Sequence, residues 1–275
     1  MIIYNKKEIK QDHFGDGTLK AEVPERLNKS ENHLDLNFFG TNFTETITWC
    51  YDNDAEIFTL RCLVDAIREA KGLKTEIDLI LPYIPHARQD REVSGRFFTL
   101  KTFASMINEM KFNKVKVLDP HSDVAPALID RCIQCLKPVD VLVIGAVAMY
   151  PDAGAAKKYK ADSTAIIGNK KRDEKGNIVD YQLLNFIEGT KTVCIIDDIC
   201  SYGGTFVYAA KALKEKGVEN ISLIVSHCED NILKGEVFDY FDGVYTTDSI
   251  CHVQHEKLRY LDYYKFREVD EEKTS

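Results

Sequence analysis

The sequence lacks the features that mark membrane-spanning and secreted proteins. Its 275 residues contain no apolar run of about 18 residues, the length that a transmembrane helix needs. The opening residues Met-Ile-Ile-Tyr-Asn-Lys-Lys include no apolar stretch long enough for a signal peptide. The eight cysteines are scattered and several stand inside apolar runs, which is typical of reduced thiols rather than of a disulfide framework. We therefore expect a cytoplasmic protein.

A surplus of positive charge is also missing. Lysine and arginine number 36 against 44 aspartate and glutamate, which gives a formal net charge of -8 at pH 7. This balance argues against a general binder of nucleic acids or membrane surfaces, because both partners are polyanions. The Walker A pattern G-x-x-x-x-G-K-(S/T) is absent, so any ATP must bind outside a P-loop.

What is present is the composition of a globular protein, with 44% hydrophobic and 29% charged residues on a chain long enough for two domains. Short apolar runs alternate with amphipathic stretches, which predicts an α/β fold with mainly parallel sheets flanked by helices. Expected strands include 46–51, 77–82, 115–119, 140–144, 193–196 and 221–225, and expected helices include 54–71, 99–110 and 205–216. Lys137-Pro138 marks the predicted boundary between an N-terminal domain, 1–138, and a C-terminal domain, 139–275.

One cysteine pair has a spacing that is used in metal and redox sites. Cys132 and Cys135 form a C-x-x-C pattern within a stretch, 125–136, that we expect to be helical. A second such pair is absent from the sequence. The spacing therefore carries little weight as a metal or redox signal.

The most informative stretch starts with four apolar residues, Val193 to Ile196, and continues with Asp197 and Asp198. A turn with two glycines and an expected helix follow. In open α/β sheets, ligands bind beyond the carboxyl ends of strands, where loop amides and a helix dipole converge. Glycines let the backbone approach an anion, and nearby hydroxyls add donors. The sequence predicts a phosphate-binding loop made of Ser201, Tyr202, Gly203, Gly204 and Thr205.

The two acids before this loop need a separate explanation, because carboxylates that face a phosphate repel it. Hydroxyl groups of a sugar and a divalent cation are the natural partners for Asp197 and Asp198. The plain alternative is an acid pair that caps a loop, with glycines that allow a tight turn.

A second stretch, 82–91, joins an expected strand end to a loop with two prolines and two arginines. Proline fixes the approach of the chain, and paired guanidinium groups suit a polyphosphate through bidentate contacts. The alternative is a solvated loop in which Arg88 or Arg91 pairs with Asp90.

Six further candidate residues lie in four segments of the sequence, each of which also has a plain structural explanation. His121 follows an expected strand and is flanked by acids, which suits a metal ligand or a simple hydrogen bond. Asp152 precedes an expected helix and is either a ligand or an N-cap. Lys170 and Arg172 belong to a charged run, 169–176, and such runs are usually solvated surface. Phe14 and Asp16 lie in a polar loop, 13–18, that is a turn when taken alone.

These motifs, in this order over about residues 12 to 250, resemble the ribose-phosphate diphosphokinases, also called phosphoribosyl pyrophosphate synthetases. The run Pro82 to Arg91 is similar to that family's Pro-Tyr-x-x-Tyr-Ala-Arg-Gln-Asp-Arg, with His86 at the second tyrosine position. The stretch from Asp197 to Thr205 resembles the family's phosphoribosyl-binding loop. The resemblance implies two tandem type I phosphoribosyltransferase-like domains.

The resemblance also implies roles for the candidate residues. The residues implied to bind ATP are Phe14, Asp16, Arg88, Gln89, Asp90 and Arg91. The protein is implied to be a homo-oligomer in which the Phe14 loop reaches the ATP site of a neighbouring subunit. Magnesium falls to His121 and Asp152. Lys170 and Arg172, on a mobile loop, join His121 in catalysis. Asp197, Asp198 and the loop 201–205 bind the ribose phosphate.

The implied reaction transfers the β,γ-diphosphoryl group of ATP to the anomeric hydroxyl of ribose 5-phosphate, giving phosphoribosyl pyrophosphate and AMP. The family has Asp-Thr where Ser201 and Tyr202 stand, and the bulky tyrosine raises the alternative of a larger acceptor such as ADP-ribose. A phosphoribosyltransferase is a further hypothesis, although such an enzyme should lack the 82–91 run and the His121 element. The last hypothesis is a non-catalytic protein that associates with a synthetase.

Overall fold

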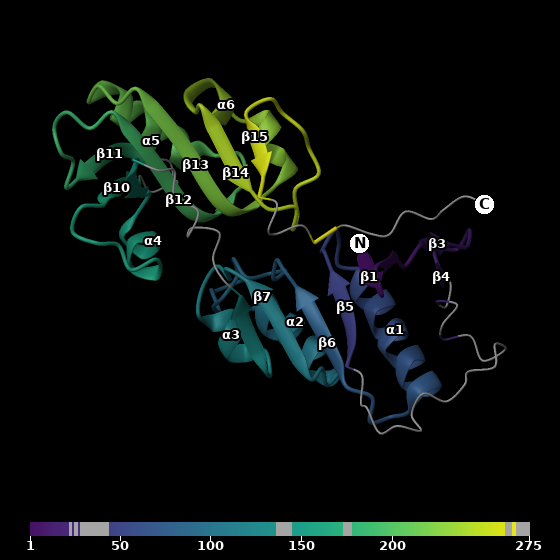
Figure 1. Ribbon diagram of the computed structural model, residues 1–275. Coiled ribbons are helices and arrows are strands. Elements are labelled where there is room, and N and C mark those ends of the chain that lie inside the picture. The colour runs from purple at the N-terminus through teal and green to yellow at the C-terminus, as the bar shows by residue number, and fades with distance from the viewer. Residues whose placement is uncertain are drawn as a thin grey trace. The chain divides into compact units, whose positions relative to one another are not determined.

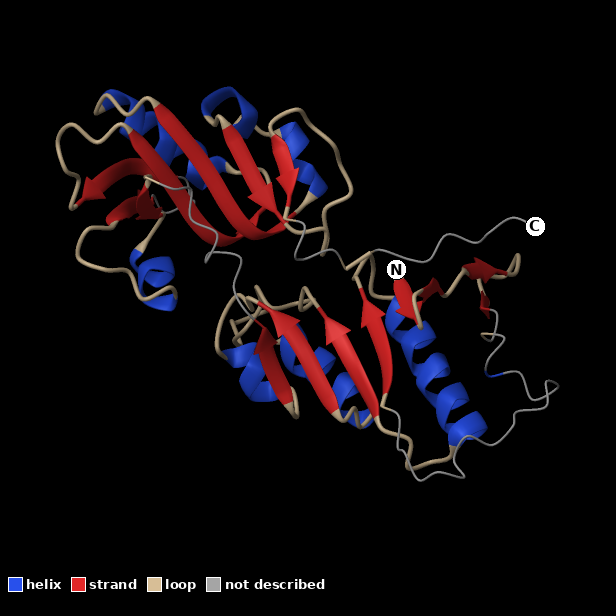
Figure 2. Cartoon of the chain, viewed as in Figure 1, coloured by secondary structure: helices blue, strands red, loops and turns tan. Residues whose placement is uncertain are grey.

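The computed structural model describes residues 1–21, 24, 27, 44–135, 145–172, 178–261 and 266–267 (Figures 1 and 2). The chain divides into two compact units, and the boundary that we predicted at 137–138 lies outside the described residues. The predicted second domain ran to residue 275, whereas Phe266 and Arg267 group with the first unit. Arg267 forms a 2.9 Å ion pair with Asp52 of that unit.

The first unit is built on a six-stranded sheet in the order β2-β1-β5-β6-β7-β8. Strands β5 to β8 are parallel, and β1 runs antiparallel to β2 and β5. The strands are β1 Ile2–Tyr4, β2 Lys7–Glu8, β5 Glu45–Trp49, β6 Ile77–Leu81, β7 Lys114–Leu118 and β8 Cys132–Cys135, and a separate hairpin joins β3 Gln11–His13 to β4 Leu19–Ala21. The helices are α1 Glu56–Lys71, α2 Thr99–Glu109 and α3 Val124–Leu128.

Apolar periodicity explains why these elements form. Helix α1 buries Leu60, Leu63, Val64 and Ile67, which recur every three to four residues and so share one face. Strand β6 reads Ile-Asp-Leu-Ile-Leu and is almost wholly buried, as expected for a central parallel strand. The predicted helices at 54–71 and 99–110 and the predicted strands at 77–82 and 115–119 are confirmed to within two residues.

The prediction that residues 125–136 are helical is confirmed only for its first part and was wrong for Cys132–Cys135. Helix α3 ends at Leu128, and Cys132–Cys135 forms strand β8, which pairs in parallel with β7. Arg131 turns the chain through the left-handed region with φ of 53° just before this strand. A short apolar segment does not distinguish helix from strand by periodicity, and the long-range pairing with β7 decides the outcome.

The second unit is built on a seven-stranded sheet in the order β11-β10-β9-β12-β13-β14-β15, parallel except at β11. Its strands are β9 Val147–Tyr150, β10 Ile166–Arg172, β11 Ile178–Leu184, β12 Thr192–Cys200, β13 Asn220–Cys228, β14 Gly243–Thr246 and β15 Leu258–Tyr260. Its helices are α4 Ala153–Lys158, α5 Gly204–Glu215 and α6 Val237–Tyr240, with the 3-10 helix η4 at Asp230–Lys234. The predicted fold class, α/β with mainly parallel sheets flanked by helices, is confirmed.

The placement of Lys170 and Arg172 on a loop was wrong. Both residues belong to strand β10, and residues 173–177, which follow it, lie outside the described residues. An antiparallel hairpin with β11 extends the strand into the charged run, because Lys170 pairs with Tyr181 and Lys171 with Asp180. Backbone pairing of this kind does not depend on apolar side chains, so charge alone was a poor guide to the end of the strand.

Among the described residues, no helix is long and apolar enough to cross a membrane. The carboxyl ends of β5, β6, β7 and β8 share one edge of the first sheet, and those of β9, β10, β12, β13 and β14 share one edge of the second (Figure 1). These two edges carry most of the predicted site residues.

Candidate functional site

The acid pair lies on strand β12, past the point where its neighbour β9 ends. The last paired residues of these two strands are Met149 and Ile195, so Asp197 and Asp198 stand at the open edge of the sheet. Asp198 is buried, and its backbone N–H donates a 2.9 Å hydrogen bond to the Asp197 carboxylate. The strand predicted at 193–196 therefore exists and extends through both acids to Cys200.

Burial and a neighbouring charge both act on the acid pair. Burial, and then the negative charge of Asp198, raise the pKa of Asp197 well above its ordinary value. The Nζ atom of Lys158, on helix α4, lies 3.4 Å from the Asp198 carboxylate and favours its ionised form. Lys158 was not identified from the sequence, where it reads as one lysine among several on a short helix.

Asp152 is an N-cap, the plain alternative that the sequence left open, and it is also paired with a lysine. Its carboxylate accepts a 2.9 Å hydrogen bond from the backbone N–H of Ala155 and so caps helix α4. The Nζ atom of Lys170 lies 2.7 Å from the other carboxylate oxygen. Burial acts to raise the pKa of Asp152, but the hydrogen bonds from Lys170 and Ala155 outweigh it. The net result is a pKa below the ordinary value.

Tyr181 is a site residue that the sequence did not reveal. It is the cross-strand partner of Lys170, so both side chains lie on the same face of the β10–β11 hairpin. Its hydroxyl donates a 3.1 Å hydrogen bond to the carbonyl of Pro151, and burial followed by the charges of Asp152 and Asp197 raises its pKa. Gly168 makes room for it, since an added Cβ there would lie 2.1 Å from the Tyr181 hydroxyl.

The predicted phosphate loop turns sharply into helix α5. Gly203 adopts a left-handed φ of 78°, and an added Cβ would lie 2.0 Å from a methyl of Val237. Helix α5 begins at the next residue, Gly204, so its first N–H groups and its dipole face the loop. Thr205 is half-buried, and the Tyr202 side chain is 55% exposed.

Glu229 lies against the first residue of this loop and was also missed. The Ser201 hydroxyl donates a hydrogen bond to the Glu229 carboxylate, and the Glu229 backbone N–H donates to the Cys200 carbonyl at 2.8 Å. Strands β12 and β13 bring the two segments together, since Cys200 and Cys228 are register partners. The only sequence signal was an acid directly after a buried strand.

The arginine run of the first unit forms one wall of a cavity of about 400 Å³. The cavity lies after strand β6, and its lining includes Arg88, Arg91 and the unpredicted Arg96. Three guanidinium groups around one hollow give a positive surface that suits a polyphosphate. His86 also lines it and turns the chain through the left-handed region with φ of 64°.

The structure also shows one of the local ion pairs that a simple solvated loop would contain. Arg91 lies 3.5 Å from Asp90, and Arg91 itself is 82% exposed. The Gln89 amide donates a 2.6 Å hydrogen bond to the Phe97 carbonyl and so closes the loop on itself. Such local contacts are compatible with phosphate binding, because an exposed surface ion pair is weak and exchanges readily.

His121 follows strand β7, the neighbour of β6, so it lies at the same edge of the sheet as the arginine loop. Its side chain is exposed. Asp119, two residues earlier, is buried and has a left-handed φ of 38°. Non-glycine residues in this region are uncommon and often stand at functional turns.

Phe14 and Asp16 form the turn of the β3–β4 hairpin. The Phe14 carbonyl accepts from the Gly17 N–H at 2.8 Å, and the Asp16 carboxylate accepts from the Thr18 N–H at 2.9 Å. The Phe14 side chain is 56% exposed.

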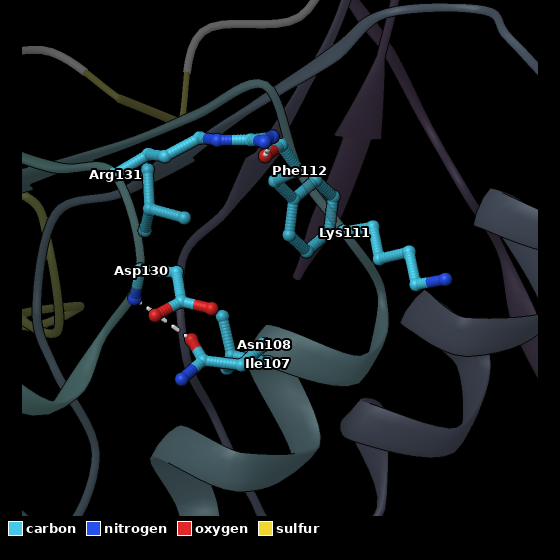
Figure 3. A pocket seen from close by; sticks show the side chains of 7 residues that line it. Ile107, Asn108, Lys111, Phe112, Asp130 and Arg131 are labelled. Atoms are coloured by element: carbon cyan, nitrogen blue, oxygen red, sulfur yellow. Dashed lines mark hydrogen bonds between the residues drawn. The ribbon is translucent and has the colours of Figure 1, made fainter.

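A second cavity in the first unit, of about 290 Å³, lies at the opposite edge of the sheet (Figure 3). It is lined where α2 ends and where β7 and β8 begin. Its Arg131 guanidinium donates a 3.0 Å hydrogen bond to the Phe112 carbonyl, and Asn108 accepts from the Asp130 N–H. These hydrogen bonds stabilise the turns that precede β7 and β8. None of the predicted site residues lines this cavity.

The described residues include no group of three or more His, Cys, Asp or Glu side chains arranged to hold a metal ion. The donors at the edge of the second sheet are nevertheless carboxylate oxygens, the ligands that Mg²⁺ prefers. Magnesium usually keeps several waters and binds through one or two carboxylates together with substrate phosphates. The residues present therefore fit a magnesium ion that arrives with a nucleotide.

Comparison with known proteins identifies relatives of the chain. It is 28% identical over 222 residues to a ribose-phosphate pyrophosphokinase of Marinomonas sp., which covers 73% of this chain and 69% of that protein. It is 27% identical over 221 residues to a ribose-phosphate pyrophosphokinase of Thermosipho africanus, with 74% and 69% covered. The chain is a divergent relative of the ribose-phosphate pyrophosphokinases. No model of a protein family matches it.

The fold of this pyrophosphokinase relative agrees with that conclusion. A phosphoribosylpyrophosphate synthetase from Mycobacterium smegmatis superimposes with a TM-score of 0.70 over 92% of this chain and 85% of the other, at 17% identity. The resemblance predicted from the sequence motifs is thus confirmed, and so is the implied fold of two tandem α/β domains.

Proposed function

We propose that this protein is a diphosphokinase that transfers the β,γ-diphosphoryl group of ATP to the anomeric hydroxyl of ribose 5-phosphate. The observation that carries the proposal is the end of strand β12, where two acids, a left-handed glycine and the N-terminus of α5 follow one another within eight residues, 197–204. Relatives named as ribose-phosphate pyrophosphokinases support it.

The acceptor binds to the second unit in this proposal. Asp197 and Asp198 accept or share hydrogen bonds with the ribose hydroxyls. The amides and hydroxyls of Ser201, Tyr202, Gly203, Gly204 and Thr205 hold the 5-phosphate. The raised pKa of Asp197 favours a proton on that acid, and this proton reduces repulsion between the pair and a phosphorylated ligand.

ATP binds to the first unit. Arg88, Arg91 and Arg96 surround its phosphates in the 400 Å³ cavity. Gln89 and Asp90, which line the same cavity, also contact the nucleotide. The exposed Phe14 and the turn at Asp16 contact the adenine of an ATP molecule that is bound to a neighbouring subunit. The active protein is therefore a homo-oligomer.

A magnesium ion bound with ATP would neutralise charge on the phosphates. Asp152 and His121 are the residues that we assign to it. Asp152 is poised for this because its pKa is held low, so it is ionised at neutral pH.

The reaction is an in-line displacement at the β-phosphorus. The anomeric oxygen of the acceptor forms a bond to this phosphorus, the bond from it to the oxygen that bridges to the α-phosphorus breaks, and AMP leaves with that oxygen. The proton of the anomeric hydroxyl passes to solvent. The transition state demands little covalent chemistry, so positioning and charge stabilisation carry the catalysis. Lys170 and Arg172, with His121, stabilise the transferring group.

A larger acceptor, such as ADP-ribose, is a second candidate. The observation in its favour is Tyr202, whose aromatic side chain is 55% exposed beside the loop and offers a stacking surface to a group beyond the 5-phosphate.

The test is to incubate the protein with ATP and Mg²⁺ and to measure AMP by chromatography, without acceptor and with ribose 5-phosphate or ADP-ribose. AMP that forms only with a ribosyl acceptor supports the proposal, and the faster acceptor decides between the two candidates. Absence of AMP with every acceptor overturns it. Pyrophosphate release from phosphoribosyl pyrophosphate and a nucleobase would then indicate a phosphoribosyltransferase, and its absence a non-catalytic protein.

A further inference from the structure

The segment from Glu229 to Val237 forms a clamp on the phosphate loop. Its first residue bonds to Cys200 and Ser201 through its backbone N–H and its carboxylate. Gly235 packs so closely that an added Cβ would lie 2.0 Å from the Tyr202 carbonyl oxygen. Val237 fills the space beside Gly203. The conformation of the loop is therefore supported by residues some thirty positions later.

Hydrogen bonds fix the Glu229 carboxylate within this clamp. The same oxygen that accepts from the Ser201 hydroxyl also accepts from the Asn231 amide at 3.3 Å. The Asn231 carbonyl oxygen in turn accepts from Lys234 at 3.1 Å. The carboxylate is half-buried and is held at the first residue of the loop, so its charge acts on whatever the loop binds.

This charge opposes the attraction of the loop for anions. The N–H groups and the dipole of helix α5 attract a phosphate, while the nearby carboxylate repels it in proportion to its charge. A terminal phosphate such as that of ribose 5-phosphate is close to a dianion at neutral pH, because its second pKa is about 6. A phosphate that is esterified on both sides carries a single charge and is repelled less.

We propose that Glu229 is a specificity-determining residue, which disfavours acceptors that end in a phosphate dianion relative to acceptors whose 5-phosphate is esterified and carries one charge. This inference rests on the proposed function, since it assumes that the loop binds the acceptor phosphate. The exposed side chain of Tyr202 agrees with it, because an esterified phosphate continues beyond the loop.

The decisive variant is Glu229→Gln, which keeps an acceptor for the Ser201 hydroxyl and removes the charge. Ligand affinities are measured by calorimetry on the intact protein for ribose 5-phosphate and for its methyl ester, which differ in charge and hardly in size. We expect the affinity for ribose 5-phosphate to rise roughly fivefold and that for the methyl ester roughly twofold, because the interaction with the removed charge is proportional to the charge of the ligand.

Two controls separate charge from structure. Glu236→Gln removes a charge from the same segment at an exposed ion pair with Lys211 and should change neither affinity. Ser201→Ala keeps the Glu229 charge, loses the hydrogen bond and should not improve ribose 5-phosphate binding.

The outcomes are distinguishable. If Glu229→Gln leaves the affinity for ribose 5-phosphate unchanged, or shifts both ligands equally, Glu229 only supports the loop and the proposal is wrong. Wild-type protein that binds neither ligand overturns it together with the acceptor half of the proposed function. Intact binding without AMP release from ATP overturns the proposed function alone.

Discussion

The Nζ atom of Lys170 lies 2.7 Å from the carboxylate of Asp152, so the cation that we assign to the transferring phosphate is held by an acid in this structure. On binding ATP, Lys170 could leave Asp152 and pair with a phosphate oxygen. The charge of Asp152 would remain neutralised if that acid then bound a magnesium ion. The ion pair therefore fixes the positions of both side chains in this structure.

Lys170→Ala should lower kcat far more than it changes ATP affinity, because the ammonium is needed where charge develops. Loss of one such donor typically costs about 100- to 1000-fold in kcat. Steady-state kinetics and ATP binding by calorimetry make the measurement. Lys171→Ala is the matched control, since Lys171 is the next residue on strand β10, is exposed and points to the other face. An unchanged kcat in Lys170→Ala removes that lysine from the mechanism.

Lys158→Met should weaken acceptor binding, because it leaves the buried Asp198 without the ammonium 3.4 Å away. We expect a KM for the ribosyl acceptor about tenfold higher, with the KM for ATP unchanged, as for removal of one partner of a partly buried ion pair. Lys157→Met, on the exposed side of the same helix, serves as the control. Recovery in Lys158→Arg would show that charge is what matters, and equal effects of the 157 and 158 changes would contradict the assignment.

Asp197→Asn should change how stability depends on pH. The pKa of Asp197 is raised in the folded protein, so its contribution to stability is fully present below the ordinary pKa of the acid and is lost as pH rises through the raised value. Wild-type protein should therefore lose stability towards neutral and alkaline pH at this site, and the asparagine variant should not.

The measurement is the melting temperature of both proteins from pH 5 to pH 9. For a chain of this size, a difference of 1 kcal/mol corresponds to about 2 to 4 °C. We expect the melting temperature of the variant to fall less than that of the wild type over this range. Parallel curves would show that Asp197 titrates as an ordinary surface acid.

The elements of the fold that were predicted correctly from the sequence are those whose signal is local. The run from Val193 to Thr205 contains its own strand, acids, glycines and helix start, so the turn at the end of β12 could be predicted without knowledge of its neighbours. The helix at 54–71 was predictable for the same reason, because its apolar period is complete within the segment.

The residues that were missed reach the site through long-range pairing. Glu229 arrives because β13 lies beside β12, Tyr181 because β11 pairs with β10, and Lys158 because helix α4 follows β9 at the same edge. No spacing within the sequence encodes these neighbours. The strand at Cys132–Cys135 was misassigned for the same reason, since only its partner β7 makes it a strand.

Gly203→Ala should destabilise the protein for two separable reasons. The left-handed φ of 78° costs a residue with a Cβ about 1 to 2 kcal/mol. The new Cβ also meets a methyl of Val237 at 2.0 Å, a contact that must be relieved by movement. We expect a total loss of about 2 to 4 kcal/mol in denaturant unfolding.

The double variant Gly203→Ala/Val237→Ala separates these two causes. This variant removes the clash and keeps the backbone strain. The loss of unfolding free energy caused by Gly203→Ala should therefore be smaller in the Val237→Ala background than in the wild type. Gly204→Ala is the control within the loop, because that glycine begins helix α5 and has nothing within 4 Å of an added Cβ. It should be neutral or slightly stabilising. If Gly203→Ala is equally harmless, the loop is not held in the left-handed turn on which the phosphate site depends.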